Sequence, residues 1–110
     1  MNIGTYMAHS RRTRNSKLSK GETVAHALTG LTSEVGEINS LFQHFFQGEA
    51  FDKKRLADEI GDLMWFTMEL LDAYNIDPSA VLKNNVAKLK KRYPEGFSEK
   101  RSAQRHNIEE

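Results

Sequence analysis

The strongest constraint on the fold is the helical periodicity of two long segments, residues 22–46 and 53–74. On a wheel with about 3.6 residues per turn, each segment gathers its apolar side chains into one arc. The first arc consists of Val24, Leu28, Leu31, Val35, Ile38, Leu41, Phe42, Phe45 and Phe46. The second arc consists of Leu56, Ile60, Leu63, Met64, Phe66, Met68, Leu70 and Leu71. No segment alternates apolar and polar residues as a strand does, so the sequence predicts an all-α fold.

Capping and breaking residues divide the chain into about four helices. The expected helices cover residues 2–12, 22–46, 53–74 and 78–92. Gly48 ends the second of them, and Pro94 and Gly96 end the fourth. We therefore expect one domain over residues 1–110, a helical bundle with a weakly ordered tail from about residue 98.

The size of the chain favours an oligomer. A domain of 110 residues buries only a limited core. The segment 53–74 also carries apolar residues over more of its wheel than the stripe of about 100° that a surface helix needs. We expect the bundle to be completed by association into a homodimer or homotetramer.

Composition excludes several kinds of chemistry and partner. The chain has no cysteine, which rules out disulfides, zinc–thiolate sites and thiol nucleophiles and suits a reducing compartment. No apolar run has the length of a signal peptide or a membrane span. A net charge of only +1 with little aromatic interleaving argues against nucleic-acid binding. We expect a soluble cytoplasmic protein that binds neither membrane nor nucleic acid.

Each long helix places one carboxylate inside its apolar arc and a second at the edge of that arc, one turn away. Glu34 and Glu59 lie inside the arcs, whereas Glu37 and Asp62 lie at the edges. A buried carboxylate costs several kcal/mol unless it is paired or binds a cation. No lysine or arginine lies on either arc, and Mg²⁺ prefers carboxylate oxygens. The four acids therefore predict a Mg²⁺ site, although acid pairs at this spacing also occur on solvated helices.

The carboxylates and their surroundings resemble the MazG-like branch of the all-α NTP pyrophosphatases. The signature of that family is Glu-x-x-Glu, a spacer, and Glu-x-x-Asp. This chain reads Glu-Val-Gly-Glu over residues 34–37 and Glu-Ile-Gly-Asp over residues 59–62, with 21 residues between them. The segment 85–98 also resembles the one that closes short members of the family. The resemblance extends from about Tyr6 to Arg105.

This resemblance implies hydrolysis of a nucleoside triphosphate, NTP or dNTP, to the monophosphate and pyrophosphate, with cleansing of the nucleotide pool as a role. It implies that Glu34, Glu37, Glu59 and Asp62 bind Mg²⁺, with Mn²⁺ as a possible substitute. It also implies that one of the two catalytic acids, Glu34 or Glu37, serves as the general base. The residues alone leave open which of the two does so.

A basic face in the last expected helix matches the polyphosphate of such a substrate. Asn85, Lys88 and Arg92 share one face at positions i, i+3 and i+7. Lys88 and Arg92 match basic positions that face the phosphates in the family, and Asn85 is a looser match. Charge-assisted hydrogen bonds from such a face suit phosphate oxygens. The alternative is an ordinary solvated face.

Two other functions compete with this interpretation. One is a phosphoribosyl-ATP pyrophosphohydrolase-like activity, which uses the same metal chemistry. The other is a non-catalytic helical interaction module, in which the acids only solvate a surface. A ferritin-like di-iron site is disfavoured, because no glutamate is followed by histidine three residues later.

Overall fold

The computed structural model describes residues 1–108, with side chains through Arg105. These residues form the helices α1 (Ile3–Arg11), α2 (Lys20–Phe46), α3 (Lys53–Ala73), α4 (Pro78–Arg92) and α5 (Glu99–Ile108). They contain no β-strand, so the all-α prediction is confirmed, and α5 is added to the four expected helices. None of the described helices has the length and apolar character needed to cross a membrane.

Local capping explains why the observed ends of the first four helices lie within two residues of the ends predicted from the sequence. Ser19 and Glu22 form a capping box at the start of α2, in which each side chain accepts a hydrogen bond from the other's backbone N–H. Asp52 accepts a hydrogen bond from the backbone N–H of Arg55 at 3.0 Å and starts α3. Gly48, with φ of 98°, follows the end of α2.

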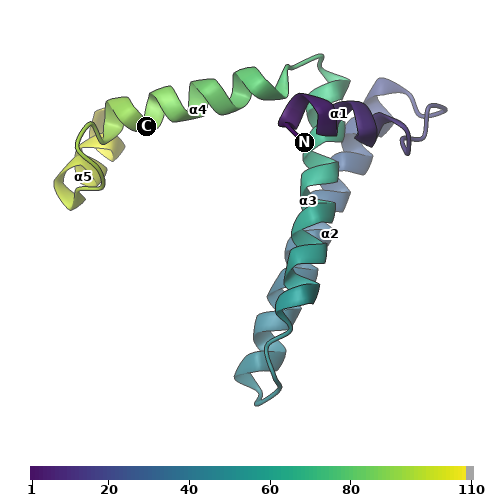
Figure 1. Ribbon diagram of the computed structural model, residues 1–110, viewed down its shortest axis with the longest axis horizontal. Coiled ribbons are helices and arrows are strands. Elements are labelled where there is room, and N and C mark those ends of the chain that lie inside the picture. Colours follow the sequence, from purple (N-terminus) through teal and green to yellow (C-terminus); the bar gives the residue numbers. More distant parts are fainter. Residues whose placement is uncertain (109–110) are drawn as a thin grey trace. The chain divides into compact units, whose positions relative to one another are not determined.

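The chain divides into two compact units, Met1–Asp77 and Pro78–Glu110. In the first unit α2 and α3 run side by side as a helical hairpin, and α1 packs against α3 (Figure 1). In the second unit α4 contacts α5. The expectation of a single domain over residues 1–110 stays a prediction.

Close packing of α2 on α3 positions the carboxylates. Gly30 is buried on α2, and a Cβ added to it would overlap the ring of Phe66 on α3. The ring therefore lies directly against the backbone of α2, which brings the two helices close together. Glu34 follows Gly30 by about one turn, so the same contact fixes where its side chain enters the space between the helices.

Polar contacts fasten the N-terminal segment to α3. Asp72 accepts hydrogen bonds from the guanidinium groups of Arg11 and Arg14, at 2.8 and 2.7 Å. Hydrogen bonding to Arg11 is the main reason why the pKa of Asp72 is lowered. The indole N–H of Trp65 donates to the hydroxyl of Thr13 at 2.8 Å. The indole N–H of Trp65 therefore has its hydrogen-bond partner within its own chain.

Candidate functional site

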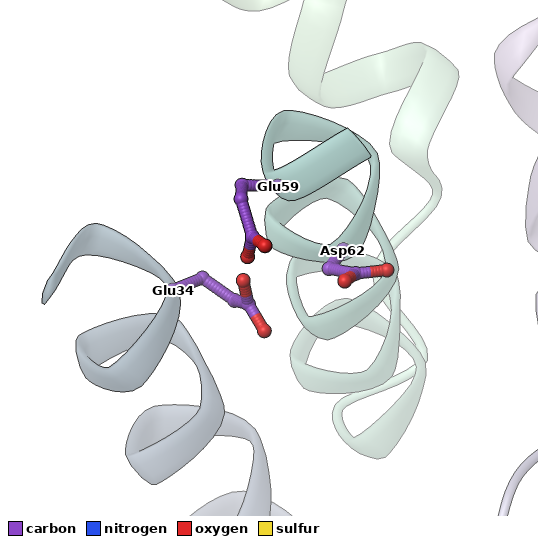
Figure 2. A group of neighbouring side chains, drawn as sticks. All are labelled: Glu34, Glu59 and Asp62. Atoms are coloured by element: carbon purple, nitrogen blue, oxygen red, sulfur yellow. The ribbon is translucent and has the colours of Figure 1, made fainter. Parts of the chain in front are cut away.

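Three of the four predicted acids converge between α2 and α3. Glu34 extends from α2, and Glu59 and Asp62 extend from α3, one turn apart (Figure 2). One carboxylate oxygen from each residue lies within 4.8 Å of the other two. Glu34 and Glu59 are half-buried, whereas Asp62 is exposed, so the cluster is open to solvent on one side.

The cluster favours a bound proton or cation at Glu34. Hydrogen bonding with the carboxyl group of Glu59 contributes most to raising the pKa of Glu34 to about 7. Desolvation and the negative charges of Glu59, Asp62 and Glu37 raise this pKa further. Oε2 of Glu34 is buried and has no hydrogen-bond partner among the described residues. A buried acceptor left in this way destabilises the fold, and a ligand at this oxygen would relieve the cost.

Glu37 lies outside this group of three, and its carboxylate contacts the guanidinium group of Arg55 instead. Its Oε2 is 3.3 Å from Nη2 of Arg55, and Nε of the same arginine is 3.5 Å from Oε1 of Glu59. Arg55 lies outside both apolar arcs, so its contacts with these acids were not predicted from the sequence. The spacing of Arg55 and Glu59, four residues apart on one helix, is the signal that could have revealed the second contact.

The cluster fits a hard divalent cation. All three side chains offer carboxylate oxygens, the ligands that Mg²⁺ prefers, and the described part of the group contains no sulfur or imidazole ligand. Oxygens around one Mg²⁺ lie about 3–4 Å apart, so the acids would need only small side-chain movements. Three carboxylates would leave coordination positions for water and phosphate oxygens.

The three predicted phosphate contacts lie in the second unit, on α4. Asn85 and Lys88 are exposed, and Arg92 is half-buried. Their spacing places them on one face of that helix. Their role toward a substrate stays a prediction.

A hydrogen bond between His26 on α2 and the buried Glu69 on α3 was not predicted from the sequence. Glu69 is 1% exposed, and its Oε1 is 2.7 Å from Nδ1 of His26. The ring of His26 lies edge-on to Trp65 and tilted against Phe66. Seven residues separate Asp62 from Glu69, which places both on one side of α3, and this spacing is the signal that could have drawn attention to Glu69. Glu69 has its partner within the chain, which makes this pair part of the packing between α2 and α3.

Comparison with known proteins adds one finding. The family model for the MazG nucleotide pyrophosphohydrolase domain matches residues 22–97, more than half of the chain. The matched segment contains all four acids and the basic face of α4. No curated protein and no solved structure matches the chain.

Proposed function

The chain belongs to the MazG nucleotide pyrophosphohydrolase family, and from this membership we propose that it hydrolyses nucleoside triphosphates, NTPs or dNTPs, to monophosphate and pyrophosphate in the presence of Mg²⁺. The observation that carries this proposal is the convergence of Glu34, Glu59 and Asp62 between α2 and α3. Cleansing of the cytoplasmic nucleotide pool is the role that we propose for this activity.

The acids would divide the chemistry between them. Glu34, Glu59 and Asp62, joined by Glu37, would hold the cation, with Mg²⁺ as the physiological ion and Mn²⁺ as a substitute. Such a cation supplies charge stabilisation to the phosphates and lowers the pKa of a bound water. Either Glu34 or Glu37 would accept the proton of the attacking water.

A screen of pyrophosphate release tests this proposal. The purified chain would be assayed with each NTP and dNTP and with phosphoribosyl-ATP, in Mg²⁺, in Mn²⁺ and in EDTA. Release of pyrophosphate from nucleoside triphosphates that stops in EDTA would support the proposal. Activity confined to phosphoribosyl-ATP would favour the related hydrolase. No turnover of any substrate would favour the interaction module.

We further propose that the chain works as a homodimer or homotetramer with closed symmetry. The hairpin of α2 and α3 leaves many large apolar side chains more than a third exposed, and a second copy would cover them. These side chains are Leu28, Val35, Phe42, Phe45, Phe46, Phe51, Ile60 and Met64. Sedimentation equilibrium is expected to give a dimer or tetramer at micromolar concentration, and a monomer under these conditions would contradict the prediction.

The basic face of α4 provides a separate prediction. Lys88→Ala is expected to lower kcat/KM by at least about tenfold, because a charge-assisted hydrogen bond to phosphate is worth about 1.5–3 kcal/mol. Replacing Arg92 by Ala in the same chain should lower kcat/KM further. Mg²⁺ affinity, measured by calorimetry, should stay within about twofold, because these residues are proposed to contact phosphate only.

Lys83→Ala is the matched control for this prediction. Lys83 lies on the same helix, is exposed, and faces away from Lys88 by helical geometry. It should retain the kcat/KM of the wild type. Equal kcat/KM in the wild type, Lys83→Ala and Lys88→Ala would assign Lys88 to an ordinary solvated face.

A further inference from the structure

Arg55 contacts acids on both helices of the hairpin. It lies in the first turn of α3 and reaches Glu37 on α2 through Nη2, at 3.3 Å, and Glu59 through Nε, at 3.5 Å. A guanidinium group can meet two carboxylates in this way because its N–H groups point in several fixed directions. One positive charge therefore bridges two residues of the Glu-x-x-Glu and Glu-x-x-Asp motifs.

This contact explains why the fourth acid lies apart. Glu34, Glu59 and Asp62 bring their oxygens together, whereas the carboxylate of Glu37 contacts Arg55. A guanidinium group and a divalent cation use the same lone pairs of a carboxylate oxygen. Arg55 and a metal ion therefore compete for Glu37, and the same holds for Oε1 of Glu59.

We propose that Arg55 is a built-in counter-ion that competes with the divalent cation, and that Glu37 exchanges Arg55 for the cation when the metal binds. This inference rests on the metal site of the proposed function. Arg55 acts here as a positioning residue, because it controls where the carboxylate of Glu37 lies. In the absence of metal it neutralises part of the acidic cluster.

The exposure of the pair makes such an exchange feasible. The side chains of Arg55 and Glu37 are 54% and 49% exposed. Ion pairs this open to water are weak, because solvent screens both charges. A divalent cation carries twice the charge and binds several carboxylates at once, so it can displace the arginine from Glu37.

Arg55→Gln, compared with Lys54→Gln, tests the proposal. Both changes remove one positive charge from adjacent positions of α3, but the exposed Lys54 makes no ion pair in the described part of the chain. The cap at Asp52 uses the backbone N–H of Arg55, so it survives the substitution. Calorimetric titration of the full chain with Mg²⁺ is expected to show a Kd about threefold to fivefold lower for Arg55→Gln than for Lys54→Gln, as the loss of a weak, exposed ion pair allows. Arg55→Lys should fall between Arg55→Gln and the wild type.

Melting in EDTA gives a second readout that needs no metal. Arg55→Gln should melt below Lys54→Gln, because only the first variant loses the charge that neutralises the cluster. Equal Mg²⁺ affinity of the two glutamine variants, or weaker binding by Arg55→Gln, would overturn the inference while leaving the metal site in place. If neither the wild type nor any variant binds a divalent cation, the proposed function fails and this inference fails with it.

Discussion

Asp62→Asn is expected to lower kcat for pyrophosphate release by at least about a hundredfold and to leave the helical circular dichroism unchanged. Asp62 contributes an exposed carboxylate to the cluster with Glu34 and Glu59. Asparagine keeps its size but removes the charge that a hard cation prefers. A hundredfold loss corresponds to about 2.7 kcal/mol in the activation barrier. Steady-state assays at saturating Mg²⁺, with far-ultraviolet circular dichroism on the same samples, provide the measurement.

Asp58→Asn is the control for this substitution. Asp58 lies one turn before Asp62 on α3, is exposed, and is not part of the carboxylate group. The same chemical change there should keep kcat within about twofold of the wild type. If Asp62→Asn retains more than about a tenth of kcat, the barrier has changed by less than about 1.4 kcal/mol, and Asp62 is not an essential ligand.

The parts of the fold that depend on neighbouring residues, such as the helix ends, could be predicted from the sequence. Both ends of α2 and the start of α3 follow from Ser19, Gly48 and Asp52, whose effects reach only a few residues along the chain. The helix α5 was missed because its segment has no apolar arc to reveal it. Its start could have been noticed from Ser98, whose side chain accepts a hydrogen bond from the backbone N–H of Arg101.

The site could be predicted only in part, because a helical wheel gives the face of a residue but not the register between helices. Glu34 and Glu59 stood out as acids inside apolar arcs, and the structure places them side by side with Asp62. The pair of His26 and Glu69 depends on how α2 and α3 are aligned, across 43 residues of sequence. Such a contact becomes visible only when both helices are placed in space.

Glu34→Gln is expected to raise the melting temperature at pH 8 in EDTA and to leave it unchanged near pH 4.5. The pKa of Glu34 is raised from 4.5 to about 7 in the folded chain, so the folded state binds more protons than the unfolded state between these values. The stability from this proton is fully present below pH 4.5 and is lost as pH rises through about 7. Glutamine resembles the protonated acid and keeps that stability at every pH. After solvent screening, the difference at pH 8 should be about 1–2 kcal/mol, or about 5–10 °C.

Mg²⁺ should raise the melting temperature of the wild type more than that of Glu34→Gln, because a cation that binds only the folded state stabilises the ionised cluster. At 100 times its dissociation constant it would add about 2.7 kcal/mol to the wild type, a rise on the order of 10 °C. Glu34→Gln, which lacks one ligand charge, should gain less from Mg²⁺, and Asp58→Asn should gain as much as the wild type. Thermal melts from pH 4.5 to 8, in EDTA and in Mg²⁺, measure all of these differences. If the melting temperatures of the wild type and Glu34→Gln in EDTA change with pH in the same way across this range, the pKa of Glu34 is not raised by its neighbours. A wild-type melt insensitive to millimolar Mg²⁺ would argue against the cation site itself.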